Sequence, residues 1–150
     1  MHNNFRFIFA KISMLARILA LDYGKMRTGI AVTDEMQLIA SGLTTVRTSE
    51  LLNFLKAYLA NENIECIVLG EPKQMDGSAS ESEMLIQPFL KKIEKYFPDV
   101  AIVRQDERFT SKMAVQSMIE GGVKKKKRQN KALVDEISAT LILQSYLERI

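Results

Sequence analysis

The stretch that decides the fold reads RILALDYGKMRTGIAVT and spans residues 17–33. Its first six residues form an apolar run that ends in Asp22, which predicts a buried strand with a carboxylate at its end. A turn containing one glycine follows at residues 23–27, and residues 28–33 predict a second strand. Because so short a turn joins the two apolar runs, we expect the strands to pair as a hairpin.

Helices and strands alternate after this hairpin, which predicts a mixed sheet with helices on its faces. Strands are predicted at 38–46, 64–69 and 100–103, and helices from 51 to about 61, up to about 97, at 110–119 and at 132–147. We expect hydroxyl side chains at 48–49 and 110–111 to cap two of these helices. Helix-spaced apolar residues give the predicted core positions of the two long helices: Met84, Leu85, Phe89, Leu90 and Ile93 in one, and Leu133, Ile137 and Leu141 in the other.

The chain has 150 residues, of which 47% are apolar and 26% charged, as is usual for one globular domain. We expect residues 1–16 to be an N-terminal extension and residues 17–150 to form a single domain. The N-terminal apolar run is too short for a signal peptide, so we expect a cytoplasmic protein. His2 and Cys66 are the only histidine and cysteine, which excludes Ser-His and Cys-His catalysis and cysteine-rich metal sites. Cys66 lies in an apolar run, where we expect a buried, inert thiol.

Positive charge is concentrated in one segment. Residues 104–131 hold nine Lys or Arg and three acids, so this segment carries +6 while the whole chain carries +3. A localised basic segment on an otherwise acidic chain favours a polyanionic partner over a merely solvated loop.

Acidic residues stand where predicted strands end and where the last helix begins: Asp22, Glu71, Asp106, Glu107 and Asp135. If the three strands concerned are parallel neighbours, these acids share one edge of the sheet. Clustered carboxylates repel one another unless a cation neutralises them, and Mg²⁺ favours oxygen ligands. One or two such ions support phosphodiester hydrolysis without a His, Cys or Ser nucleophile. Taken singly, each acid also fits an ordinary turn, loop or helix-end position, so only the joint arrangement points to a metal site.

Four stretches together resemble the Holliday-junction-resolvase-like family, also called pre-16S rRNA nucleases. They are LDYGKMRTGIA at 21–31, VLGEPK with MDG at 68–77, DERFT at 106–110, and the segment from Val134-Asp135 to Tyr146-Leu147. The resemblance implies an α/β RNase H-like fold, with a five-stranded mixed sheet flanked by helices. It also implies a metal-dependent endonuclease, with a role in maturing the 5′ end of 16S ribosomal RNA.

By position, the resemblance makes Asp22, Glu107 and Asp135 the catalytic residues and the ligands of one or two Mg²⁺ or Mn²⁺ ions. It also implies that Arg108 and the basic run face nucleic acid, and we expect Lys25 and Arg27 to help position the strand. The basic run consists of Lys124, Lys125, Lys126, Lys127 and Arg128.

Two acids stay open as additional ligands, Glu71 and Asp106. The family usually has an apolar residue where Glu71 stands, and we favour a harmless loop substitution there. Side chains of adjacent residues point to opposite sides of a strand, so Asp106 and Glu107 compete for one role, and the resemblance favours Glu107.

Several alternatives remain open at the level of the sequence. The substrate is precursor rRNA, which we favour, or branched DNA, and the protein is a monomer or a homodimer that could associate with ribosomal particles. A non-catalytic nucleic-acid-binding factor, active in ribosome assembly or transcription, would keep the basic run but would have no use for the acids. An actin-like ATPase shares the first glycine-containing turn but needs two such domains. No membrane partner is expected.

Overall fold

The computed structural model describes residues 15–108 and 110–150, and all structural statements concern that part of the chain. The expected N-terminal extension falls mainly on residues 1–14, which lie outside the described residues. Ala16 is already buried in the core. The strands are β1 (Arg17–Tyr23), β2 (Arg27–Thr33), β3 (Ala40–Arg47), β4 (Ile64–Glu71) and β5 (Ala101–Asp106). The helices are the 3₁₀ helix η1 (Thr48–Glu50), α2 (Leu51–Asn61), α3 (Ser82–Tyr96), α4 (Thr110–Glu120), α5 (Lys125–Arg128) and α6 (Lys131–Arg149).

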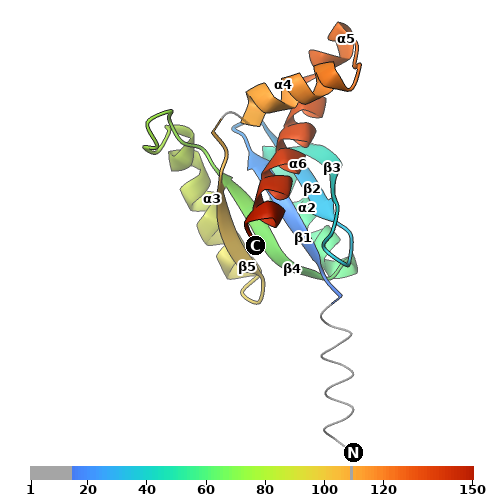
Figure 1. The fold of residues 1–150 in the computed structure, drawn as a ribbon. Coiled ribbons are helices and arrows are strands. Elements are labelled where there is room, and N and C mark those ends of the chain that lie inside the picture. Colours follow the sequence, from blue (N-terminus) through green and yellow to red (C-terminus); the bar gives the residue numbers. More distant parts are fainter. Residues whose placement is uncertain (1–14, 109) are drawn as a thin grey trace, which may run out of the picture.

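The five strands form one mixed sheet in the order β3-β2-β1-β4-β5 (Figure 1). β1 pairs antiparallel with β2, and β2 antiparallel with β3, as the predicted hairpin requires. β1 and β4 are parallel, as are β4 and β5. The predicted mixed sheet is therefore confirmed, and the carboxyl ends of β1, β4 and β5 meet at one edge.

Helices cover both faces of this sheet (Figure 1). Leu19 and Leu21 of β1 pack in a core with α2 and α3. Ile18 and Ala20 point the opposite way, into a second core formed with α6. Because side chains alternate along a strand, each residue of β1 is assigned to one helical layer by its position. Cys66 belongs to the α6 core, where burial raises the pKa of its thiol, as expected for an inert cysteine.

β4 and β5 are longer than predicted, since they end at Glu71 and Asp106 instead of at residues 69 and 103. Glu71 and Asp106 are partners in the parallel ladder. Both strands therefore continue beyond their apolar runs because their backbones pair with each other. Hydrophobic patterning alone does not detect such an extension.

The predicted cap at residues 48–49 is wrong. The Thr48 hydroxyl donates to the carbonyl of Gly24 at 2.6 Å, and no side chain caps η1 or α2. The Thr110 hydroxyl donates to the carbonyl of Glu107 at 2.6 Å. Both threonines use their donor to fix a preceding loop, and the predicted cap of α4 at residues 110–111 stays a prediction.

The buried stripe of the two long helices also differs from the prediction. In α3, Phe89 and Ile93 are buried as expected, but Met84 is 78% exposed and Leu85 46% exposed. The predicted α6 positions are only half-buried, and the residues that pack on the sheet are Ser138, Ala139, Ile142 and Leu143. The small side chains of Ser138 and Ala139 suit a helix that lies very close to β2. The close approach is seen at Gly29 of β2, where a Cβ atom would clash with the backbone of α6. Within the described residues, no helix is long and apolar enough to cross a membrane.

Candidate active site at the carboxyl edge of the sheet

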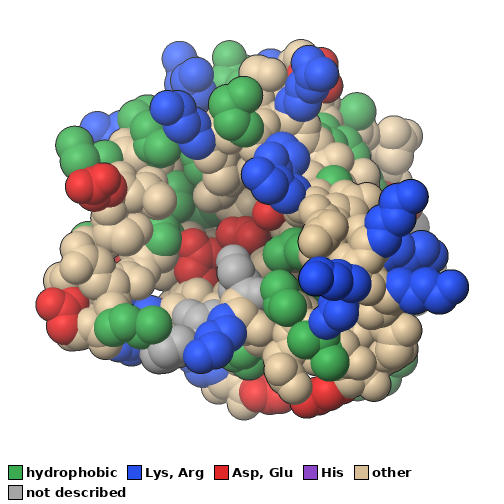
Figure 2. Space-filling view, turned by 90° about the horizontal axis from the view of Figure 1, so that it is seen from above, with side chains coloured by type: hydrophobic (Ala, Val, Ile, Leu, Met, Phe, Trp, Pro, Cys, Tyr) green, Lys and Arg blue, Asp and Glu red, His purple; other side chains and the backbone are tan. Residues whose placement is uncertain are grey.

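Asp22 lies near the end of β1 and continues the Ile18 and Ala20 side of the strand, so its position in the alternation places it on the α6 face. Glu107 follows β5 directly, and its amide donates to the carbonyl of Glu71 at the end of β4. Both acids thus stand at the edge where the parallel strands end. Seen from this side, acidic side chains lie at the bottom of a hollow in the surface (Figure 2).

The carboxyl groups of Asp22 and Glu107 contact each other. Burial is the main cause that raises the pKa of Asp22 from 3.8 to about 6 and that of Glu107 from 4.5 to about 9. The contact between the two carboxyl groups lowers the pKa of Asp22 and raises that of Glu107. The negative charge of Asp22 raises the pKa of Glu107 further. Both carboxyl groups therefore hold their protons to higher pH than exposed acids do.

Gly70 makes room for the Glu107 side chain. A Cβ atom at position 70 would lie 2.3 Å from Oε2 of Glu107 and 3.0 Å from Cδ1 of Ile142 on α6. Oε2 of Glu107 is buried and accepts no hydrogen bond from the described residues. A buried carboxylate oxygen without a donor is unfavourable, so this atom is available to a ligand.

Asp135 approaches the pair from α6. Asn130 caps this helix, because its side chain accepts hydrogen bonds from the amides of Ala132 and Leu133. A Cβ atom on Gly29 of β2 would lie only 2.0 Å from the carbonyl oxygen of Asp135. Gly29 pairs with Asp22 in the β1–β2 ladder, so this close approach brings the helix to the acid pair. The charge of Asp135 accordingly raises the pKa of Asp22.

Arg27 holds the Asp135 carboxylate. Its Nε donates to Oδ2 of Asp135 at 2.8 Å, with the two side chains 40% and 23% exposed. The residue expected to contact nucleic acid thus forms an ion pair with one of the expected metal ligands. This contact orients Asp135 while leaving part of the guanidinium exposed to solvent.

The two additional acids considered from the sequence are both engaged elsewhere. Glu71 pairs with Lys73 at 3.2 Å, and Asp106 pairs with Arg108 at 2.8 Å. The hydrogen bonds from Arg108 lower the pKa of Asp106. The structure therefore brings together Asp22, Glu107 and Asp135 and leaves Glu71 and Asp106 in ion pairs beside them.

Basic side chains lie above, to the right of and below a hollow that has acidic side chains at its bottom (Figure 2). Lys25 is exposed on the β1–β2 turn. In the basic run, Lys124 to Lys127 are exposed and Arg128 is half-buried, and the run lies mainly on the short helix α5. Arg108 is less available, because it contacts both Asp106 and the carbonyl of Met75.

The residues present fit a divalent cation in part. The Asp22–Glu107 pair supplies uncompensated carboxylate oxygens, including the buried Oε2 without a donor, and hard cations favour such ligands. Over residues 15–108 and 110–150, however, no three acidic, histidine or cysteine side chains form a ready cluster for an ion. Asp135 can join the pair only when its carboxylate is shared with, or released from, Arg27.

Sequence reasoning missed two structural supports of the site, Gly70 and the Arg104–Glu83 pair. Arg104 contacts both oxygens of Glu83, at 2.6 and 2.9 Å, and also donates to the carbonyls of Leu69 and Gly70. It thereby fixes the end of β4 between β5 and α3. The available signal was an arginine directly after a predicted buried strand, because a charge so close to the core needs a partner.

The strand order and the acids at the carboxyl edge define an RNase H-like α/β protein. The chain belongs to the Holliday junction resolvase family, RuvX, whose family description matches residues 16–149. This confirms the resemblance and the fold that it implied.

Curated relatives cover nearly the same region. A protein of Christiangramia forsetii is 65% identical over 133 residues, which are 89% of this chain and 98% of the relative. A protein of Flavobacterium psychrophilum is 60% identical over 90% of this chain and 98% of its own length. A protein of Bacteroides thetaiotaomicron is 59% identical over 89% and 97%, respectively. Each is named "Putative pre-16S rRNA nuclease".

Proposed function

We propose that the protein is a metal-dependent endonuclease that hydrolyses phosphodiester bonds in the 5′ region of precursor 16S rRNA. The observation that carries this proposal is the half-buried Asp22–Glu107 pair, with the charge of Asp135 close enough to raise the pKa of Asp22. The names of the relatives support the RNA substrate, and such a role would place the protein in the cytoplasm.

Asp22 and Glu107 would hold one or two Mg²⁺ or Mn²⁺ ions, with Asp135 as a further ligand. When bound, the cation supplies Lewis acidity that activates water and stabilises charge on the phosphate oxygens. Cation binding requires Glu107 to release its proton, because the protonated acid is a poor ligand. Lys25 and the basic run would bind the backbone phosphates, while Arg27 orients Asp135.

A second candidate substrate is branched DNA, which the description of the family favours. Backbone phosphates look similar to lysines in RNA and DNA, so the basic run does not distinguish them. A junction needs two cuts and hence two copies of the site, whereas RNA end processing needs one. We favour RNA, on the names of the relatives.

The test is a cleavage assay in Mg²⁺, Mn²⁺ or EDTA on a precursor 16S 5′ leader, an unrelated single-stranded RNA and a four-way DNA junction. We expect metal-dependent cutting of the leader that is lost in Asp22→Asn and Glu107→Gln. Glu71→Gln is the matched control, because Glu71 lies at the same edge but pairs with Lys73. Equal traces for wild type and Asp22→Asn would overturn the nuclease proposal, and metal-independent binding without cutting would favour a non-catalytic factor.

A further inference from the structure

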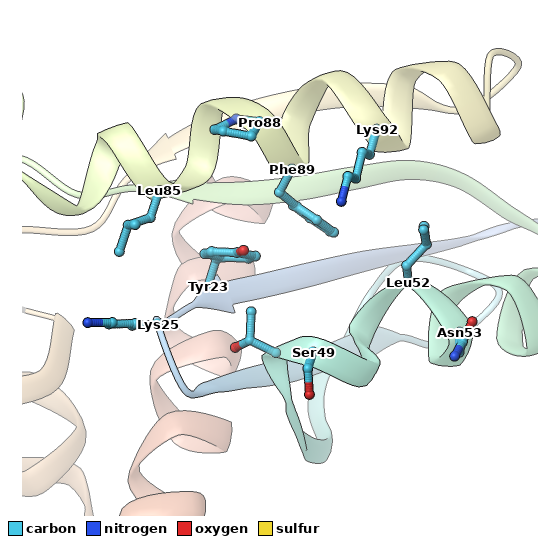
Figure 3. A pocket seen from close by; sticks show the side chains of 10 residues that line it. Tyr23, Lys25, Ser49, Leu52, Asn53, Leu85, Pro88, Phe89 and Lys92 are labelled. Atoms are coloured by element: carbon cyan, nitrogen blue, oxygen red, sulfur yellow. The ribbon is translucent and has the colours of Figure 1, made fainter.

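A cleft opens between α2 and α3 beside the acid pair, with a volume of about 450 Å³ (Figure 3). Asp22 and Tyr23 are consecutive in β1, so they point to opposite faces of the sheet. Asp22 belongs to the α6 side, whereas Tyr23 lines this cleft. The cleft therefore begins one residue from the proposed cleavage site but lies in the other helical layer.

The middle of the cleft is aromatic. The rings of Tyr23 and Phe89 contact each other with centroids 4.9 Å apart and planes at 31°. Leu52 from α2 and Leu85 from α3 add apolar wall on either side (Figure 3). The Tyr23 hydroxyl makes no hydrogen bond with the described residues, so it is available to a ligand. Such a surface suits a nucleobase, which stacks on aromatic rings and carries polar edges.

The ends of the cleft are basic. Lys25 stands at one end and Lys92 toward the other, with the aromatic pair between them (Figure 3). Neither lysine has an ion-pair partner in the described part of the chain, and no acid lines the cleft. Each nucleotide of a strand has a phosphate on both sides of its base and sugar. The cleft has a lysine at each end and an aromatic pair in the middle. This arrangement is complementary to a nucleotide, which has a base between two phosphates.

The β1–β2 turn that carries Lys25 is fixed in place. The Gly24 amide donates to the Arg27 carbonyl at 2.9 Å, and the Thr48 amide donates to the Met26 carbonyl at 3.0 Å. The Thr48 hydroxyl binds the Gly24 carbonyl at 2.6 Å. These bonds join the turn to the start of α2, so the cleft and the cleavage edge share one rigid boundary.

We propose that this cleft binds one nucleotide of the substrate strand that flanks the cleaved phosphodiester, with its base on Tyr23 and its two phosphates at Lys25 and Lys92. This inference rests on the proposed nuclease function, because it assigns the cleft to the same substrate. It adds a position at which the base itself contributes to binding, which the lysine run does not.

The test uses metal-free protein, so that binding is measured without cleavage. Fluorescence anisotropy of short single-stranded RNA is compared for wild type, Lys92→Glu and Lys91→Glu. Lys91 is the matched control, since it is an exposed lysine on the same helix that does not line the cleft. We expect Lys92→Glu to bind about tenfold more weakly than Lys91→Glu at low salt. Equal affinity of the two variants would overturn the proposal.

A second measurement locates the base and uses the same RNA with one abasic nucleotide moved along it. We expect a single position to lower affinity about tenfold in wild type and to have little effect in Tyr23→Leu, because that base stacks on Tyr23. A uniform response at all positions would contradict the cleft. A protein that cuts no substrate but shows both results would retain the nucleotide site while the nuclease proposal fails. Cleavage by wild type, together with equal RNA affinity of the Lys91 and Lys92 variants, would retain the nuclease and overturn the nucleotide site.

Discussion

The carbonyl oxygen of Asp135 lies 2.0 Å from the point where a side chain on Gly29 would begin. Helix α6 thus rests on the backbone of β2 at the residue that pairs with Asp22. Two acids that are far apart in the sequence meet because one residue between them has no side chain.

Gly29→Ala should move the start of α6 away from the sheet. Since the clash is with backbone, relaxation requires the helix to shift, and we expect a loss of about 3 kcal/mol in the free energy of unfolding. Cleavage should fall as well, because Asp135 moves with the helix. Urea denaturation measures the first effect and the leader cleavage assay the second.

Gly42→Ala is the control for that prediction. A Cβ atom at position 42 would lie 2.5 Å from Oε1 of Glu136, which is the end of a flexible side chain. Glu136 can turn aside, so the loss should stay below about 1 kcal/mol. Similar losses in both variants would show that the close approach at Gly29 does not position α6.

The acid pair should make the metal-free protein less stable as pH rises. The folded-state pKa of Asp22 is raised from 3.8 to about 6 and that of Glu107 from 4.5 to about 9, so the folded protein binds more protons than the unfolded chain between these values. Stability is then highest at the acid end of this window and falls until pH about 9. Thermal melts in EDTA across this range measure the decline, with all other titrating groups contributing to a common background.

Glu107→Gln isolates the pair from that background. Glutamine cannot ionise in either the folded or the unfolded state, so the variant does not lose the stability that wild type loses as its unfolded chain releases the Glu107 proton. The variant should therefore be more stable than wild type by about 2 kcal/mol near pH 8, with the gain vanishing toward pH 4. Added Mg²⁺ should stabilise wild type near pH 8 and have little effect on the variant. A variant that is less stable than wild type at both pH values would contradict the raised pKa of Glu107.

Arg27→Gln should bind divalent cations more tightly than wild type. Arg27 occupies Oδ2 of Asp135, and its loss frees that carboxylate and removes a nearby positive charge. We expect Mn²⁺ affinity to rise several-fold, while stability changes by less than about 1 kcal/mol because the pair is partly exposed. Titration calorimetry with Mn²⁺ measures the affinity.

Arg47→Gln controls for charge alone. Arg47 is exposed on β3 and is the ladder partner of Arg27, but it has no ion pair with Asp135. Its removal should change Mn²⁺ affinity less than that of Arg27. If the two variants bind Mn²⁺ equally well, Asp135 does not serve as a cation ligand.

The basic run should determine how strongly binding depends on salt. Replacing Lys124 to Lys127 by glutamine should reduce the slope of log affinity against log salt by about 3 for single-stranded RNA, since each phosphate contact contributes about 0.7. Replacing Lys91 and Lys95, which are exposed on α3, should leave the slope nearly unchanged. Filter binding between low and moderate salt measures it, and an unchanged slope in the first variant would remove the run from the interface.

The position of Asp22 could be predicted because one apolar run ends directly at a carboxylate and a glycine turn follows. The shared edge of β1, β4 and β5 could be predicted only on the condition that these strands are parallel neighbours, and the structure shows that they are. The choice between Asp106 and Glu107 could not be made from alternation. β5 extends to Asp106 by pairing with β4. Because the predicted strand ended at residue 103, the alternation of side chains could not be extended to residues 106 and 107.

Neither the buried face of α6 nor the close contacts at Gly29 and Gly70 could be predicted from the sequence, and the reason is the same for both. Each depends on how closely two segments approach that are distant in the chain, and hydrophobic spacing reports only the periodicity of one segment. Leu133, Ile137 and Leu141 have helical spacing, but the face of α6 that is buried on the sheet is that of Ser138, Ala139, Ile142 and Leu143. Likewise, Arg27 carries no local sign that its partner is Asp135.

The space at Gly70 is filled by the Glu107 carboxylate and bordered by Ile142, which has a consequence for how these positions can vary. In this fold, residues 70 and 107 share one volume, so a side chain at position 70 and the reach of the acid at position 107 are coupled. Alanine at position 70 would displace the Glu107 carboxylate and bring a methyl group against Ile142. A lineage that acquires alanine there would keep the acid in place most readily with aspartate at position 107 and a smaller side chain at position 142.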